Sequence, residues 1–321
     1  MFRFLIRYTA YPVVAVGVAI LLVTLATQGI AYWPAFPMIV VASFGIVTTL
    51  ERIAPYEPVW NNDHGDTRVD ILHLLTSHAL IQSGVAIAFG LRLLLPEDLA
   101  LWPASWPIWA QVLLAGAIMD LGLYSMHRWS HVQPFLWRLH VLHHSPERLY
   151  WLNGGRRHPL SALALAGPGL LTLLALGATP IAVGAWMSIM SVHLAFQHAN
   201  LDYRLGPFRH LLGVGELHRW HHKRDYEDAQ VNFGEVWMIW DRLFGTYHDA
   251  PQTPRAGEVG LRETRVPDGY WAQLCWPWTQ VDSKQTVTLD LGPGRSLTLI
   301  ERASLRRNLN RPGFSRHFRA P

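Results

Sequence analysis

Apolar and polar residues alternate in long blocks along the chain, and the lengths of the apolar blocks predict helices that cross a bilayer. A spanning helix needs about 20 mostly apolar residues. Residues 9–33 contain no charged side chain, and residues 106–126 contain only Asp120. Apolar stretches of this kind cover residues 9–33, 37–50, 71–95, 106–126 and both halves of 160–198, which turn near 177–180. The pattern predicts an all-α integral membrane bundle with about six spans.

Basic residues are distributed unevenly between the two ends of these spans. The loops near 28–37, 96–105 and 177–181 contain no Lys or Arg. The other ends and connections carry Arg3, Arg7, Arg52, Arg68, Arg128, Arg138, Arg148, Arg156, Arg157 and Arg204. Cytoplasmic loops of membrane proteins are enriched in Lys and Arg. We therefore expect both termini on the cytosolic side, with 127–158 and 199–321 on that same side.

Composition agrees with a membrane location. The 321 residues are 50% hydrophobic and only 16% charged, whereas an average soluble domain is about 25% charged. The net charge of +4 could indicate nucleic acid, but 15 Trp and the long apolar runs favour a membrane protein with a basic cytosolic face. We expect no nucleic-acid partner, one membrane domain over 1–321 with a basic cytosolic tail at about 280–321, and a location in a bacterial inner membrane.

Histidine is strongly enriched, and the histidines form three clusters. Twelve of the 17 lie between His127 and His222. The clusters are HRWSH with His127 and His131, HVLHH with His140, His143 and His144, and HRWHH with His218, His221 and His222. Residues at i, i+3 and i+4 share one face of a helix, so each cluster directs its imidazoles one way. The predicted topology places all three at one membrane face, as a histidine-rich cytosolic cap.

The clusters contain more ligands than one metal ion requires. A zinc site takes three or four protein ligands, whereas the clusters supply eight imidazoles, which suits two ions. Cys275 is the only cysteine, so a thiolate cluster is excluded. Imidazole binds Zn, Cu, Fe and Ni, and the spacing alone does not select among them. No histidine is followed by Glu, which weakens a zinc peptidase of the H-E-x-x-H type. A membrane zinc-dependent hydrolase and a non-catalytic metal-binding membrane protein remain alternatives.

The order of these motifs resembles the fatty acid hydroxylase/sterol desaturase superfamily. The resemblance covers about residues 110–250, the expected catalytic region. Beyond the histidine clusters, it rests on RRHPL (156–160), FQHAN (196–200), HHKRD (221–225), NFG (232–234) and IWDRLFGTYH (239–248). Members of this superfamily are histidine-rich di-iron oxygenases of membranes. The resemblance therefore implies an O2-dependent hydroxylase or desaturase that acts on a membrane lipid, such as an acyl chain, sterol, ether lipid or lipid head group.

The resemblance also implies a ligand set and an electron source. The two iron ions would be bound by His127, His131, His140, His143, His144, His218, His221 and His222, with His198 of FQHAN as a further ligand. The sequence contains no His-Pro-Gly-Gly segment typical of a fused cytochrome b5 domain. Electrons would then come from an external donor, either a ferredoxin, a cytochrome b5 or a reductase.

Three further residues are candidates for a supporting role. Asp120 lies two helical turns before His127, and a charge inside a span usually marks function; it would support a metal ligand or pair with a nearby Arg. His158 belongs to the RRHPL stretch and either supports the metal ligands from behind, gates the substrate or is structural. His193 lies five residues before His198, about 140° away around a straight helix, so we expect it to support the site without binding metal.

Overall fold

The computed structural model describes residues 2–92, 101–262, 264–279, 285–290 and 296–301. The chain divides into two compact units, Met1–Gln273 and Leu274–Pro321. The described strands, β1 (Gln285–Asp290) and β2 (Ser296–Glu301), form an antiparallel pair in the second unit. The arginines of the predicted basic tail from Arg302 onward lie outside the described residues.

The first unit is helical, and five of its described helices are long and apolar enough to cross a membrane. One runs over Phe2–Thr27 as α1 (Phe2–Tyr11), a π-helical turn η1 (Pro12–Val16) and α2 (Gly17–Thr27). The others are α3 (Ala35–Ile53), α5 (Ile108–Val132), α7 (Pro159–Leu176) and α8 (Pro180–His198). The remaining predicted span, at 71–95, corresponds to α4 (Thr67–Arg92), which is not among the five. A multi-pass helical bundle is thereby confirmed.

The turn between α7 and α8 lies where the sequence predicts it. Gly177 ends α7 with a φ of +76°, a left-handed conformation that costs a residue without Cβ little. Pro180 then opens α8 at its first position, where the missing N–H breaks no hydrogen bond. The apolar run 160–198 is therefore two helices in one hairpin.

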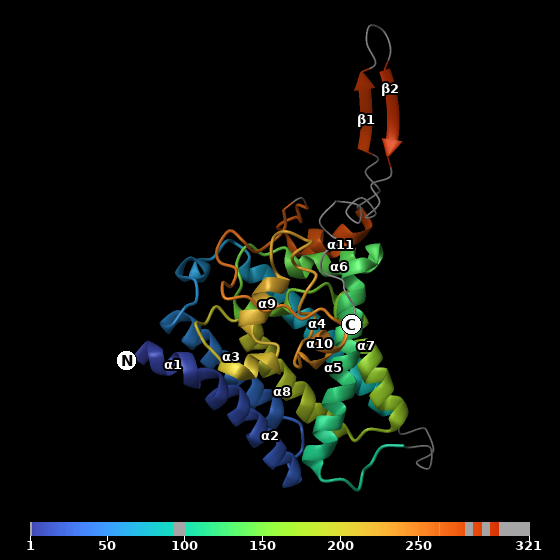
Figure 1. Cartoon of the computed structure of the whole chain (residues 1–321). Coiled ribbons are helices and arrows are strands. Elements are labelled where there is room, and N and C mark those ends of the chain that lie inside the picture. The colour runs from blue at the N-terminus through green and yellow to red at the C-terminus, as the bar shows by residue number, and fades with distance from the viewer. Residues whose placement is uncertain (1, 93–100, 263, 280–284, 291–295, 302–321) are drawn as a thin grey trace. The chain divides into compact units, whose positions relative to one another are not determined.

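The bundle is centred on α5 and α8. Helix α5 packs against α7 and α8, while α2 and α3 pack on α8 and α4 packs on α7. The backbones of α5 and α7 approach closely, because a Cβ on Gly122 would lie 2.7 Å from the Gly169 nitrogen. Small residues at such contacts are typical of membrane helix pairs. Figure 1 shows this arrangement along the bundle.

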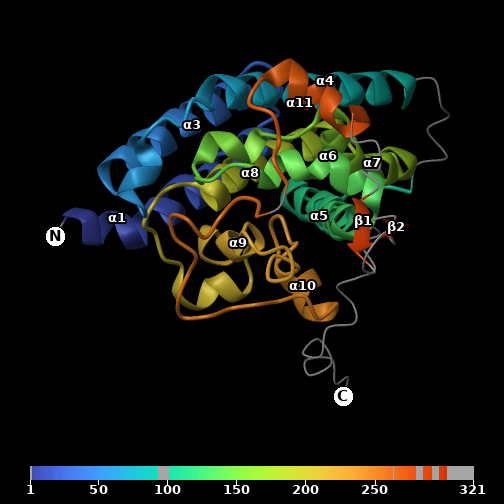
Figure 2. The same cartoon turned by 90° about the horizontal axis from the view of Figure 1, so that it is seen from above.

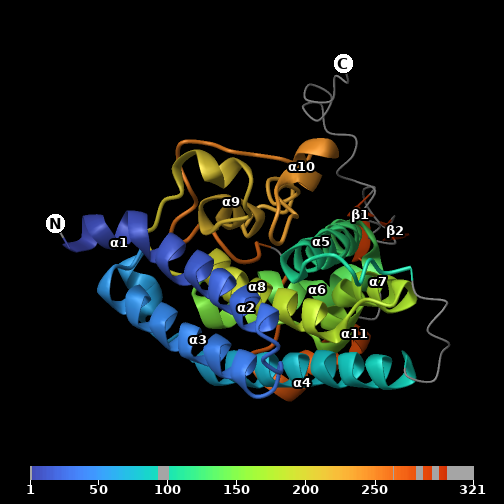
Figure 3. The same ribbon diagram turned by 90° about the horizontal axis from the view of Figure 1, so that it is seen from below.

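Short elements gather at one end of the long helices. Helices α5 and α8 end there and α7 begins there, while Glu51 near the end of α3 accepts hydrogen bonds of 2.7 Å from the Trp151 and Asn200 amides. Figures 2 and 3 show α9 and α10 on one side of α5 and α8, and α4 on the other. The other described helices of the chain are η2 (Pro58–Asn61), α6 (Pro134–His144), η4 (Trp151–Gly155), η5 (Gly206–His210), α9 (Gly215–His221), α10 (Ile239–Leu243) and α11 (Tyr270–Thr279).

Candidate metal centre

Nine buried histidines converge where α5, α6, α8 and α9 meet. They form two groups. Within each group every ring offers one nitrogen atom, and these nitrogen atoms all lie within 4.8 Å of one another. The first histidine group is His127, His131, His140, His144 and His221, and the second histidine group is His143, His198, His218 and His222. These are the nine residues that the sequence singles out as ligands.

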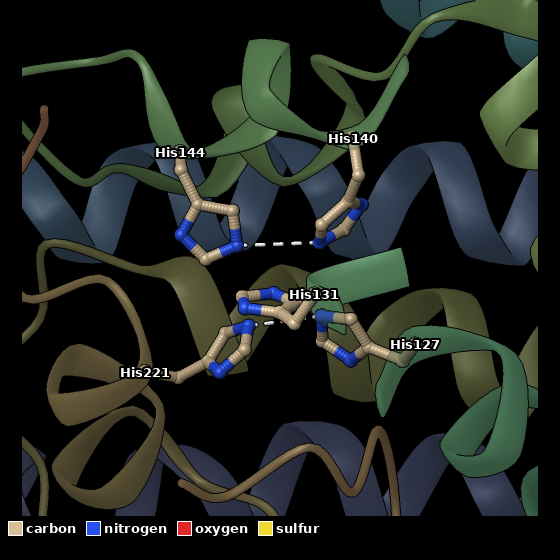
Figure 4. Close-up of side chains that lie close together, drawn as sticks. All are labelled: His127, His131, His140, His144 and His221. Atoms are coloured by element: carbon tan, nitrogen blue, oxygen red, sulfur yellow. Dashed lines mark hydrogen bonds between the residues drawn. The ribbon is translucent and has the colours of Figure 1, made fainter. Parts of the chain in front are cut away.

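The first histidine group draws on three separate helices. His127 and His131 come from the end of α5, His140 and His144 from α6, and His221 from α9. Figure 4 shows the five rings facing a common centre. The Nε2 atoms of His127 and His221 are 2.9 Å apart, and those of His140 and His144 are 3.2 Å apart.

The second histidine group joins α8 to α6 and α9. His198 is the last residue of α8, and its Nε2 lies 2.9 Å from Nε2 of His218. His222 Nε2 lies 3.0 Å from the same His218 atom. The ring centroids of His144 and His222 are 4.5 Å apart, so the two groups are direct neighbours. The arrangement suits a pair of adjacent ions.

Hydrogen bonds on the far side of the rings determine which nitrogen faces the centre. His127 Nδ1 lies 2.9 Å from the Phe233 carbonyl oxygen, and His221 Nδ1 lies 2.9 Å from that of Val231. A carbonyl only accepts, so each Nδ1 carries the proton and each Nε2 carries a lone pair. Two lone pairs that face each other at 2.9 Å repel, and a cation bound by both would remove that repulsion. These tautomers therefore fit a metal centre.

His198 is oriented in the same way by a side chain. Its Nδ1 lies 3.1 Å from Oδ1 of Asn153 in η4. The Asn153 amide nitrogen donates to the Arg148 carbonyl at 2.7 Å, which fixes the oxygen toward the histidine. Hydrogen bonds of this kind set the tautomer and ring orientation of metal-binding histidines. Asn153 carries no signal in the sequence, because its contact with His198 spans 45 positions.

Burial keeps the imidazoles neutral. For the ligand candidates outside the spans, burial lowers the pKa values well below the usual range of histidine. These candidates are His140, His143, His144, His218, His221 and His222. The positive charge of Arg157 adds to this effect at His140, His143 and His221. Both nitrogens of His143 and Nε2 of His131 are buried without a hydrogen-bond partner among the described residues. Neutral rings with unused lone pairs are the donor set that imidazole-binding metals require.

Asp120 is buried and holds a loop. Its Oδ1 accepts from the Val236 amide at 2.9 Å, and its Oδ2 accepts from the Trp237 amide and Trp240 Nε1, both at 3.0 Å. The same loop begins with Phe233, whose carbonyl orients His127. The contacts thus place Asp120 behind the loop that orients His127, a candidate ligand.

Asp241 supports the other side of this loop. Its carboxylate accepts from the Phe233 amide at 2.8 Å and from the Gly234 amide at 2.7 Å. Burial raises the pKa of the Asp241 carboxyl. A Cβ on Gly234 would lie 2.7 Å from Oδ2 of Asp241, so glycine permits this close approach. Asp120 and Asp241 together fix the loop that carries the Phe233 carbonyl.

His158 and His193 lie outside both histidine groups. His158 caps α7, where its Nδ1 accepts from the Leu160 amide at 3.2 Å. His193 Nδ1 lies 2.7 Å from the Tyr11 hydroxyl, and its Nε2 lies 3.0 Å from the Gly213 carbonyl oxygen. Protein groups thus occupy both ring nitrogens of His193, which leaves no free lone pair for a metal.

Glu235 is a site residue that sequence reasoning missed. It is fully buried, its carboxylate accepts from Arg157 Nη2 at 3.0 and 3.3 Å, and Oε1 lies 3.6 Å from Nδ1 of His127. An isolated Glu after the NFG stretch carries no spacing signal, because its partners lie 78 and 108 positions away in the sequence. The carboxylate neutralises an arginine next to the first histidine group.

An apolar cavity of about 120 Å³ lies within the bundle near this centre. Residues of α3, α4, α5, η4, α7 and α8 line it. Its apolar walls include Leu74, Ile81, Leu165, Met187, Met190 and Leu194. Gly154 also lines it, and a Cβ there would lie 3.1 Å from Cγ of His198. Gly154 therefore lies between the cavity and His198 of the second histidine group.

Comparison with known proteins identifies the family. The fatty acid hydroxylase family model matches residues 112–246, which include all nine clustered histidines and His193. Ornithine lipid hydroxylase OlsE of Rhizobium tropici is 34% identical over 261 residues, covering 78% of each chain. Human alkylglycerol monooxygenase is 30% identical over 153 residues, 46% of this chain and 32% of that protein. Fatty acid hydroxylase vlmA of Lecanicillium is 32% identical over 168 residues, 46% of this chain and 45% of that protein.

These matches extend beyond the histidine clusters. The alignment with the ornithine lipid hydroxylase covers most of both chains, whereas that with the alkylglycerol monooxygenase covers only about a third of the longer protein. No solved structure matches this chain. The chain belongs to the fatty acid hydroxylase family.

Proposed function

We propose that this protein is an O2-dependent hydroxylase of a membrane lipid. The observation that carries the proposal is the convergence of nine buried imidazoles in two adjacent groups beside an apolar cavity. An unactivated C–H bond is beyond the reach of side-chain acids and bases, so the reaction needs a metal centre that activates dioxygen. The relatives are hydroxylases or monooxygenases of lipids by name, which favours hydroxylation over desaturation.

The nine histidines are proposed to hold two iron ions, one in each histidine group. Bound there, the iron pair would supply the electrons and Lewis acidity that activate O2. Hydroxylation inserts one oxygen atom of O2 into the C–H bond and releases the other as water, consuming two electrons and two protons. A ferredoxin, a cytochrome b5 or a reductase is the proposed source of these electrons.

The chain's own residues orient the ligands and keep the reaction away from water. The Phe233 and Val231 carbonyls fix the tautomers of His127 and His221, and Asn153 fixes that of His198. The walls of the cavity would receive the hydrocarbon part of the lipid. Because the cavity lies within the bundle and only Gly154 of η4 separates it from His198, a lipid chain held there would lie beside the metal centre.

The proposed location is a bacterial inner membrane, with both termini and the metal centre on the cytosolic side. The distribution of arginines supports this orientation. The ends of α5 and α8 and the start of α7 share the side that carries these arginines. Electron donors of the cytosol could reach that side directly.

The proposed function is tested with the purified, iron-loaded protein, total membrane lipids, a ferredoxin with its reductase, and ¹⁸O2. Mass spectrometry should find lipids that carry one ¹⁸O atom, whereas H2¹⁸O with ordinary O2 should give none. His143→Ala should abolish the product. His210→Ala is the matched control, because His210 belongs to neither histidine group and bonds the Tyr247 hydroxyl at 2.6 Å.

Two results would contradict the proposal. One is the absence of any oxidised lipid when the metal sites are full and a chemical reductant replaces the ferredoxin. The other is lipid cleavage that takes its label from water, which would favour the zinc hydrolase.

A further inference from the structure

The cavity beside the metal centre has a charged group in its wall. Arg157 is the one Arg, Lys, Asp or Glu among the cavity's described lining residues. It lies two residues after Gly155 of η4, which also lines the cavity. Polar groups of Ser77, His78, Gln82 and Ser191 contribute to the same lining. A pocket that only held a hydrocarbon chain would not need a guanidinium, because an apolar wall is sufficient for that purpose.

The hydrogen bonds of Arg157 leave donor capacity unused. Its Nη2 donates to both carboxylate oxygens of Glu235, at 3.0 and 3.3 Å. Its Nε is buried and has no acceptor among the described residues. A guanidinium has five N–H donors and no acceptor, and leaving a buried donor unsatisfied is costly. The Arg157 side chain is 12% exposed and the residue lines the cavity, so a ligand oxygen that meets the guanidinium there would use this spare donor capacity.

The neighbouring hydroxyls have already donated their hydrogens. Ser77 Oγ donates to the Arg157 carbonyl at 3.0 Å, and Ser191 Oγ donates to the Met187 carbonyl at 2.8 Å. Their oxygens can still accept, but they cannot provide a donor while these bonds persist. The lining therefore offers a strong donor at Arg157, which selects a ligand with an acceptor oxygen.

Arg157 is also close to both histidine groups. Its partner Glu235 lies 3.6 Å from His127 of the first group. Gly154, three residues earlier in the chain, lies against His198 of the second group, with a Cβ position 3.1 Å from its Cγ. A ligand oxygen on Arg157 would place the carbons next to it near the metals, while the rest of the chain extends between the apolar walls.

We propose that Arg157 is a specificity-determining residue that binds an acceptor oxygen of the lipid. The oxidised carbon then lies within a few bonds of that oxygen and not in the middle of the hydrocarbon chain. This inference rests on the proposed function and narrows its substrate class. A carboxylate, an amide or ester carbonyl, and an ether or hydroxyl oxygen of a lipid share the required chemistry.

The wild-type enzyme provides a test that no folding defect can obscure. The probes are N-acyl amino acids, alkylglycerols and plain alkanes, each as a series of chain lengths. Tandem mass spectrometry then locates the new hydroxyl. We expect its position to be constant when counted from the oxygen-bearing end, and we expect the alkanes to react poorly. The class that reacts fastest identifies the source of the oxygen.

Two outcomes of this series would overturn the inference alone. One is a position that is constant when counted from the methyl end, and the other is oxidation of alkanes at an equal rate. A complete absence of oxidation in every series would instead reject the proposed function, and this inference with it.

Adjacent arginines provide a matched pair of variants. Arg157→Lys retains a positive charge beside Glu235 but removes the planar fork of donors. It should lower kcat/KM for oxygen-bearing lipids about 10- to 100-fold, the effect of losing one charge-assisted hydrogen bond, and broaden the position of hydroxylation. Arg156→Lys is the control, because Arg156 bonds Asp70 at 3.0 Å and is not among the residues that line the cavity. Iron content and melting temperature are measured for both variants.

An unchanged kcat/KM and product position in Arg157→Lys would overturn the inference. If that variant loses iron, the wild-type series decides the question by itself.

Discussion

Replacing Asp120 with asparagine should weaken the metal centre without changing any histidine. The Asp120 carboxylate accepts three hydrogen bonds, from the Val236 and Trp237 amides and from Trp240 Nε1. Asparagine has the same shape but offers one acceptor oxygen and one NH2 donor. In its better orientation the amide oxygen faces the Trp237 and Trp240 donors, and the NH2 group faces the Val236 amide. One buried N–H is then stranded against another donor.

The magnitude follows from these contacts. A stranded buried donor costs about 1–3 kcal/mol, and a hydrogen bond that changes from charge-assisted to neutral loses about 1 kcal/mol. With one stranded donor and two weakened bonds, Asp120→Asn should destabilise the loop by about 3–5 kcal/mol. For a chain of this size, such a loss lowers the melting temperature by roughly 5–9 °C. Because the loop includes the Phe233 carbonyl that orients His127, metal affinity should fall as well.

The assay is chelator competition followed by metal analysis, with thermal unfolding measured in the same detergent. Asp225→Asn is the matched control, because Asp225 pairs at the surface with Arg262, whose side chain is 61% exposed. A surface pair of this kind contributes about 0–1 kcal/mol, so the control should resemble the wild type. If Asp120→Asn melts and retains metal as the control does, Asp120 does not support the centre.

Three other perturbations separate the roles of neighbouring residues. His193→Ala should retain the full metal content, because protein groups already occupy both ring nitrogens of His193. His198→Ala, in contrast, should lose metal from the second histidine group. Elemental analysis of both variants checks this difference, and equal losses of metal would contradict it. Gly155→Ala should raise the KM for lipid at unchanged metal content, because the new Cβ would lie 2.5 Å from Leu74 Cδ1 and 3.2 Å from Leu74 Cα in the cavity wall. Steady-state kinetics that match the wild type would show that the lipid does not contact this part of the cavity. Removing the metal should lower the melting temperature, since a ligand at a thousandfold excess over its Kd stabilises the folded protein by about 4 kcal/mol. Adding iron should restore the melting temperature. An unchanged melting curve would argue against a metal centre that joins the helices.

The histidine groups could be predicted from sequence because their geometry is largely local. Spacings of three and four place imidazoles on one helical face, and the distribution of arginines places the three clusters at one end of the spans. The partition into two groups is not local. His140 and His144 belong to one group, while His143, between them, belongs to the other. That division depends on how α8 and α9 approach α6, which no spacing within α6 encodes.

The supporting residues could not be predicted for a related reason. Glu235 and Asn153 contact histidines 108 and 45 positions away, and each is a single polar residue without a repeating pattern. Asp120 illustrates an intermediate case, because its place in a span marks it as functional. Its actual partners are N–H groups of a loop more than a hundred positions later, and these follow from tertiary packing alone.

The most direct test of the account is the number and identity of metal ions in the purified protein, determined by elemental analysis and Mössbauer spectroscopy. We expect about two irons per chain, with a spectrum typical of a coupled pair, and a loss of iron in His143→Ala but not in His210→Ala. A single zinc per chain, or an iron content that His143→Ala leaves unchanged, would contradict it.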